Sequence, residues 1–208
     1  RPDLIIVLGG PEVSHEWAEQ PIIGLANYLV TGPADLAFAR LCRRVLADDP
    51  PVETVIAAEY PPLDQLALPY RLYTDEDIAH RLIYVEASRG CPFRCEFCLS
   101  ALDKTAWPFP LELFLAEIQQ LYDRGVRHFK FVDRTFNLNA KVGARILDFF
   151  LERLDERLFL HFELIPDHLP EPLKERIVRF PPGTLQFEIG IQTFNPAVQA
   201  LIDRKQDN

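Results

Sequence analysis

Three of the four cysteines in this chain, Cys91, Cys95 and Cys98, lie within one short segment, Cys-Pro-Phe-Arg-Cys-Glu-Phe-Cys. Such short intervals do not suit a disulfide framework and indicate metal ligation in a reducing compartment. Most iron–sulfur clusters take four thiolates. A loop that supplies only three leaves one iron open to another ligand, as a catalytic metal site does. The spacing therefore predicts a cluster with an open coordination position.

The remaining cysteine and the histidines leave two alternatives open. Cys42 could supply a fourth thiolate, although it lies on the apolar stripe of a predicted helix, where a small core residue is the plainer interpretation. A structural zinc site would need a second cysteine pair or two suitably spaced histidines. The five histidines, at positions 15, 80, 128, 161 and 168, show no paired ligand spacing. The sequence favours a cluster over zinc.

The segment from Ser88 to Cys98 resembles the signature of the radical S-adenosylmethionine (radical SAM) superfamily, CxxxCxΦC, with Phe97 as the aromatic residue. The resemblance implies that Cys91, Cys95 and Cys98 hold a 4Fe–4S cluster whose open iron is chelated by SAM, and that the Phe97 segment lies against the adenine. Reductive cleavage of SAM would then release methionine and a 5′-deoxyadenosyl radical that abstracts hydrogen from a substrate.

The elements that must position this loop alternate between strand-like and helix-like patterns, which is typical of parallel βα units and an α/β fold. Four units amount to half of an eight-fold barrel, and active sites of such barrels lie at the carboxyl ends of the strands. The superfamily barrel commonly has six strands, so the resemblance places the closing strands beyond Asn208. The predicted strands are 82–87, 128–132, 158–164 and 185–191.

Alternate residues of a strand face opposite sides, and the outer side of a barrel must be apolar to receive helices. This pattern turns four polar side chains toward the interior of the barrel: Glu86, Glu163, Glu188 and Gln192. Unpaired buried carboxylates are costly, so the pattern predicts a functional interior. The alternative is that these groups pair with internal Arg or Lys, or that the register differs by one residue. The second strand, 128–132, is ambiguous in this respect.

The resemblance extends to SAM-binding residues of coproporphyrinogen dehydrogenase and related radical SAM enzymes. It implies that Glu163, Gln192 in Gly-Ile-Gln-Thr, and Arg204 contact SAM, with the guanidinium suited to the methionyl carboxylate. By itself, Arg204 could equally be a solvated cation at a helix end. The usual Gly-Gly-Glu stretch after the second strand is replaced by Asp-Arg-Thr-Phe-Asn at 133–137.

The N-terminal part is similar to the C-terminal part of a Rossmann-like cobalamin-binding domain, through Gly-Gly-Pro-Glu at 9–12 and Gly-Pro-Ala-Asp at 32–35. An ordinary turn explains the first glycines equally well. We expect this domain over 1–48, a proline-rich linker over 49–80, and a partial radical SAM barrel over 81–208. The whole chain resembles an uncharacterised cobalamin-domain subfamily, which implies methyl transfer or rearrangement where cobalamin binds.

The composition limits the class of protein. The 208 residues are 48% hydrophobic and 25% charged, as in globular proteins, and no apolar run approaches the roughly 20 residues of a membrane span. The net charge of −9 disfavours nucleic acid as a partner. The chain begins with Arg1 and contains no Met, so we expect an excised segment.

We therefore predict a cytoplasmic radical SAM enzyme with a 4Fe–4S cluster, SAM and, in its subfamily, cobalamin as cofactors. It would act on a small-molecule or peptide substrate, with flavodoxin or ferredoxin as the type of reductant. The alternative is a non-catalytic iron–sulfur or zinc module that serves interaction or electron transfer. The sequence assigns no residue that reacts with the substrate.

Overall fold

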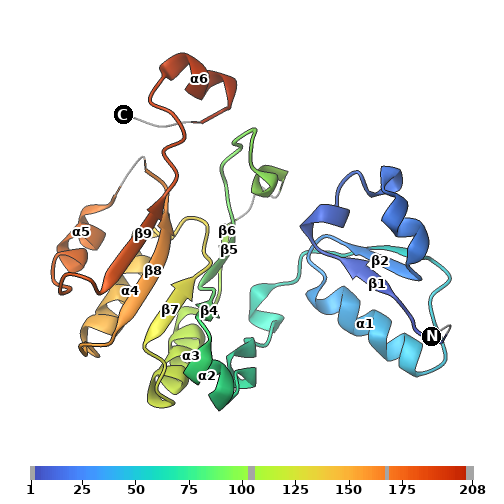
Figure 1. The fold of residues 1–208 in the computed structure, drawn as a ribbon, viewed down its shortest axis with the longest axis horizontal. Coiled ribbons are helices and arrows are strands. Elements are labelled where there is room, and N and C mark those ends of the chain that lie inside the picture. Colours follow the sequence, from blue (N-terminus) through green and yellow to red (C-terminus); the bar gives the residue numbers. More distant parts are fainter. Residues whose placement is uncertain (1–2, 103–105, 167–168, 205–208) are drawn as a thin grey trace. The chain divides into compact units, whose positions relative to one another are not determined.

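A computed structural model describes residues 3–102, 106–166 and 169–204 of the chain. It divides into two compact units, Arg1–Leu66 and Ala67–Asn208, which are described here one at a time (Figure 1). Within the described residues, no helix has both the length and the apolar character needed to cross a membrane.

The first unit is a small parallel sheet with one long helix. Its core forms where Val30 of the middle strand meets Ala37 and Leu41 of the helix, all three at most 3% exposed. The first strand is displaced from the predicted run, because residues 4–6 precede it and remain more than 40% exposed. The sheet order is β1 (Val7–Gly9), β2 (Tyr28–Thr31) and β3 (Val55–Ala57), and the helix is α1 (Asp35–Leu46).

The segment 49–80, predicted as a linker, contains regular elements at both ends. β3 pairs in parallel with β2, with Val30 opposite Ile56, and so completes the sheet of the first unit. Three residues between proline-rich stretches are too few to show a period of their own, which is why sequence periodicity misses this strand. At the other end, α2 (Asp75–His80) is closed by a capping box between Thr74 and Asp77. That pattern was readable in the sequence.

The second unit is a partial βα barrel, as the alternating pattern predicts. The four strands of its main sheet are all parallel, and β9 forms one edge (Figure 1). The strands lie within the predicted ranges, in the order β4 (Ile83–Val85), β7 (His128–Phe131), β8 (Phe159–Leu164) and β9 (Leu185–Ile189).

The helices of the second unit follow the capping signals in the sequence. Gly125, with φ of +99°, follows the end of α3, where a left-handed residue commonly ends a helix. The Asn195 side chain accepts hydrogen bonds from the first turn of α6, and Pro196 is the first helical residue. The helices after α2 are α3 (Leu111–Asp123), α4 (Ala140–Leu151), α5 (Glu171–Ile177) and α6 (Pro196–Leu201).

An aromatic core joins the second sheet to its helices. Phe129 and Phe131 of β7 are fully buried and lie 5.2 and 6.2 Å, between ring centroids, from Phe150 of α4. Phe162 of β8 lies 4.5 Å from Phe131, so neighbouring strands share the same packed face. This resolves the ambiguous second strand: its phenylalanines face the helices, and Lys130 between them faces the other side.

A short hairpin that the sequence analysis does not predict leads into the cysteine loop. β5 (Ser88–Gly90) pairs antiparallel with β6 (Ala106–Pro108), with Arg89 opposite Trp107. Both strands have three residues, so neither carries a readable alternation. The hairpin fixes the backbone immediately before Cys91.

Candidate functional site

The cysteine loop begins where β5 ends, after Gly90 with φ of +94°. Cys95 is buried, and Cys91 and Cys98 are half-buried; all three are free thiols. The backbone turns tightly here, because the Cys98 amide donates to the Cys95 carbonyl at 2.9 Å. Burial raises the pKa of the Cys91 thiol, and the thiols of Cys98 and Cys95 raise it further. The sulfurs of Cys98 and Cys95 are thus near enough to affect the pKa of Cys91.

One cavity of about 380 Å³ brings together every site residue predicted from the sequence. It lies between the cysteine loop and the carboxyl ends of β8 and β9, the position expected for a barrel active site. The predicted residues that line it are Cys91, Cys95, Phe97, Cys98, Glu163, Gln192 and Arg204. These residues come from segments far apart in the sequence and line the same cavity.

Arg204 is joined to the cysteine loop. Its guanidinium donates to the Cys95 sulfur at 3.3 Å and to the Gly190 carbonyl at 2.7 Å. Its Nε atom is buried and has no hydrogen-bond partner among the residues that the structure describes, so a ligand in the cavity could accept from it. These contacts are not those of a solvated cation at a helix end, which was the alternative interpretation of Arg204.

Gln192 occupies a constrained backbone position at the rim of the cavity. Its φ of +66° lies in the left-handed region, which non-glycine residues seldom adopt. Its side chain folds back over Gly190, where an added Cβ would lie 2.7 Å from the Gln192 amide nitrogen. The glycine is therefore needed to accommodate this orientation of Gln192.

The carboxylates predicted to face the barrel interior do so, and each has a cationic partner. Glu86 pairs with Arg89 at 2.9 Å, and Lys130 lies 2.9 Å from Glu188 and 3.6 Å from Glu163. The internal pairing considered as an alternative is therefore also present. Glu163 and Glu188 line the cavity, whereas Glu86 belongs to a different group of contacts.

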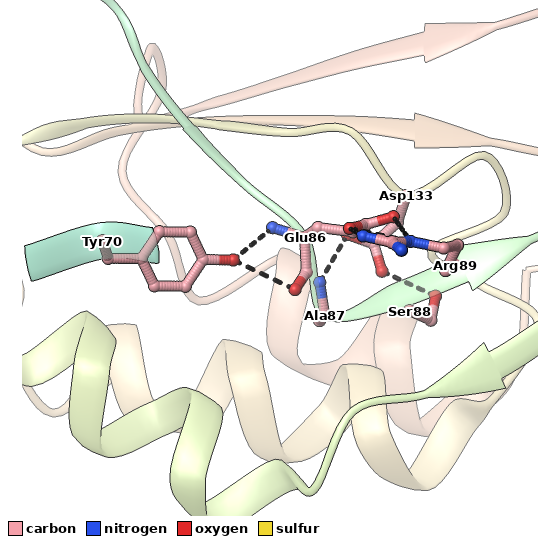
Figure 2. A network of polar contacts seen from close by, with 6 residues as sticks. All are labelled: Tyr70, Glu86, Ala87, Ser88, Arg89 and Asp133. Carbon is pink, nitrogen blue, oxygen red and sulfur yellow. Dashed lines mark hydrogen bonds and ion pairs between the residues drawn. The ribbon is translucent and has the colours of Figure 1, made fainter. Parts of the chain in front are cut away.

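Asp133, a residue to which the sequence analysis gives no role, anchors the strand that leads into the cysteine loop. It is 1% exposed and accepts from the Ala87 amide at 2.9 Å and from the Ser88 hydroxyl at 2.6 Å (Figure 2). Burial raises its pKa to about 6. Figure 2 also shows Tyr70 bonded to the backbone of Glu86 through both its amide and its carbonyl. The sequence signal that could have indicated this role was the position of Asp133, directly after a predicted strand and before Arg-Thr-Phe-Asn.

The donor set fits a cluster. A 4Fe–4S cluster binds each thiolate to a different iron, so its ligands surround a volume instead of meeting at a point. Cys91, Cys95 and Cys98 border one cavity from a single short loop, as that arrangement requires. In the described part of the chain, no three Cys, His, Asp or Glu side chains gather closely enough to hold a single metal ion. Cys42 lies half-buried in α1 of the first unit.

Comparison with known proteins agrees with this geometry. The sequence profile of the radical SAM superfamily matches residues 85–208. An uncharacterized methyltransferase of Pyrococcus horikoshii is 27% identical over 185 residues, an alignment that covers 75% of this chain and 38% of that protein. The chain thus spans well under half the length of this relative.

Two solved structures share the fold across both units. Both are of the radical SAM methyltransferase TsrM from Kitasatospora setae, one with tryptophan and a SAM analogue bound and one with cobalamin and a [4Fe–4S] cluster bound. Each has a TM-score of 0.72 and covers 99% of this chain, at 15% and 14% identity. This chain corresponds to 45% and 46% of those chains.

Proposed function

The chain belongs to the radical SAM superfamily, and from this membership we propose that it forms the cluster- and SAM-binding part of an enzyme that modifies a small-molecule or peptide substrate. The observation that carries the proposal is the single cavity lined by the three cysteines together with Glu163, Gln192 and Arg204. When bound, the cluster and SAM supply the reductive cleavage of the SAM sulfonium.

The residues of the chain would bind and orient these groups. The thiolates of Cys91, Cys95 and Cys98 hold the cluster. The Arg204 guanidinium pairs with the methionyl carboxylate of SAM, because charge-assisted hydrogen bonds are strong and the buried Nε still has a proton to donate. Glu163 and Gln192 bind the amino group and the ribose hydroxyls. Phe97, at the wall of the cavity, lies against the adenine.

Cobalamin is proposed as a further cofactor, with methyl transfer as the reaction and rearrangement as the second candidate. Support comes from the fold shared with a TsrM structure that contains cobalamin, and from the first unit. Two glycines lie just after the carboxyl ends of β1 and β2: Gly10 has open space on its Cβ side, and Gly32 has φ of +74°. We propose Arg1–Leu66 as part of a Rossmann-like cobalamin-binding domain and the second unit as part of a radical SAM barrel.

The environment of the protein follows from the same chemistry. Free thiols intended for a cluster need a reducing compartment, so we propose the cytoplasm. An external one-electron donor such as flavodoxin or ferredoxin would reduce the cluster. The alternative function, an iron–sulfur module that transfers electrons or mediates interaction, needs the cysteine loop but not Glu163, Gln192 and Arg204.

The test is anaerobic reconstitution with iron and sulfide, followed by addition of SAM and a reductant. We expect a brown protein with an iron–sulfur signal in electron paramagnetic resonance, and conversion of SAM to 5′-deoxyadenosine, or to S-adenosylhomocysteine if the methyl group is transferred. Cys91→Ala, Cys95→Ala and Cys98→Ala should each abolish the cluster, whereas the matched control Cys42→Ala should retain it. A colourless zinc protein, or a cluster that leaves SAM intact, would contradict the proposal.

A further inference from the structure

Lys130 is a half-buried cation on the interior side of the second sheet. It lies in β7 between two phenylalanines that face the helices, and its own side chain, 13% exposed, faces the opposite side of the sheet. Strand register places it directly between Tyr84 of β4 and His161 of β8. Lysine is seldom this buried without partners, so its contacts indicate why it is there.

A single ammonium group contacts three side chains from two neighbouring strands. The Lys130 Nζ atom donates to Glu188 Oε2 at 2.9 Å, lies 3.1 Å from His161 Nε2 and 3.6 Å from Glu163 Oε1. His161 Nε2 is also 3.3 Å from the same Glu188 oxygen. The three donors of an ammonium group can satisfy such a set, and Lys130 thus links β7 to both β8 and β9.

The two carboxylates contacted by Lys130 are residues of the cavity wall. Glu163 and Glu188 are paired in register on adjacent strands, so their backbones lie roughly 5 Å apart and their charges repel. Both line the cavity that contains the cysteines, whereas Lys130 and His161 do not. The cation therefore lies behind the wall, where it can hold the carboxylates in place without touching a ligand.

We propose that Lys130 is a positioning residue: by contacting the carboxylates of both Glu163 and Glu188, it fixes Glu163 in the orientation that binds SAM. The inference rests on the proposed function, because it assumes that SAM occupies this cavity. Without Lys130, the two carboxylates move apart and Glu163 loses the orientation that meets its ligand. His161 would support the same arrangement through its contact with Glu188.

The charge of SAM allows a positioning role of Lys130 to be distinguished from a simple effect of its positive charge on SAM binding. SAM carries a net charge of about +1 near neutral pH, since its sulfonium and ammonium outweigh one carboxylate. Removal of a cation behind its site would strengthen SAM binding if only the net potential mattered. Loss of positioning predicts the opposite sign. The direction of the change in SAM affinity therefore decides between the two roles.

The experiment compares wild type, Lys130→Met and Lys130→Arg, each with a reconstituted cluster, by equilibrium dialysis with radiolabelled SAM. We expect Lys130→Met to bind SAM about tenfold more weakly, the size of loss typical when a residue that orients a binding group is removed. Lys130→Arg, which keeps the charge, should recover part of the affinity. Unchanged or tighter binding by Lys130→Met would overturn the inference. No binding by wild type would instead contradict the proposed function itself.

A second measurement needs neither cluster nor SAM. In the apoprotein, a double-mutant cycle of Lys130→Met and Glu163→Gln should show that Glu163→Gln restores part of the unfolding midpoint lost in Lys130→Met, because it removes the carboxylate left unpaired, whose side chain is only 25% exposed. The matched control is the exposed pair Lys174 and Glu171, 3.3 Å apart, which should show little coupling. Equal coupling in both cycles would show that Lys130 holds no carboxylate in place.

Discussion

At the residue scale, the site could be predicted because its residues belong to short sequence patterns. The spacing of Cys91, Cys95 and Cys98 specifies the loop, and strand alternation specifies which side Glu163 faces. The alternation of residues along one strand does not reveal which side chains form hydrogen bonds or ion pairs, because these partners come from other segments. The contacts of Lys130 with Glu188, and of Arg204 with Cys95, therefore appear only in the structure.

The buried carboxyl of Asp133 predicts an unusual dependence of stability on pH. Its folded pKa of about 6 lies above the ordinary value of 3.8, so between these pH values the folded protein binds more protons than the unfolded chain. Stability contributed by this group is present below pH 4 and is lost as the pH rises through 6. In Asp133→Asn, whose amide can still accept from Ala87 and donate to Ser88, this loss should be absent.

The measurement is chemical denaturation of the apoprotein from pH 4 to 7. Trp17→Phe serves as the background, so that Trp107 of β6 reports on the second unit alone. Relative to wild type, Asp133→Asn should gain up to about 3 kcal/mol in the free energy of unfolding across this range. Asp133→Ala, which leaves the Ala87 amide unsatisfied, should instead lose about 1–3 kcal/mol at pH 4. Parallel pH profiles of wild type and Asp133→Asn would contradict the assigned burial effect.

At the element scale, the four parallel strands could be predicted because each lies in a longer run of strand-like residues, and the helices α3 to α6 because they show a period or a cap. β3, β5 and β6 could not: β3 is a short apolar run near prolines, and β5 and β6 contain no apolar run. What stabilises them is pairing with distant segments, such as β5 with β6. The range predicted for β4 extends two residues past its end at Val85, where the Asp133 side chain replaces a strand hydrogen bond by accepting from the Ala87 amide.

Asn137 makes such a replacement and gives an element-scale prediction. It is 3% exposed, and its amide both donates to the Ile165 carbonyl and accepts from the Ile165 amide, each at 3.0 Å. These bonds extend the end of β8 just beyond Glu163. Asn137→Ala should lower the free energy of unfolding by about 2 kcal/mol, because two backbone groups lose buried partners.

Asn137→Asp provides the discriminating comparison. Its carboxylate can accept from the Ile165 amide but would oppose the Ile165 carbonyl, so its loss of stability relative to wild type should be larger at pH 7 than at pH 4, where protonation restores a donor. Thermal unfolding followed by circular dichroism measures both variants. A substitution at this position without effect would show that β8 needs no extension beyond its last residue.

At the scale of the whole molecule, the profile of the radical SAM superfamily covers residues 85–208, all of them in the second unit. The glycine positions of the first unit could be read from the sequence, whereas its third strand could not.

The first unit predicts that cobalamin binds to this chain independently of the cluster. Apoprotein mixed with hydroxocobalamin should retain the red chromophore on gel filtration, and Cys91→Ala, which cannot complete the cluster, should retain it equally. Elution of all the cobalamin in the small-molecule fraction would contradict the proposed role of Arg1–Leu66. It would leave the radical SAM assignment of the second unit intact.

The contact between Arg204 and Cys95 joins residues 109 positions apart. During synthesis, the ribosome exposes the thiols long before it adds the arginine that supports them. The loop therefore acquires its final surroundings only when nearly all of this segment has been translated. While the chain is still being elongated, the cysteine loop lacks its contact with Arg204. We therefore expect the cluster to be inserted after the second unit has been synthesised, not during its synthesis.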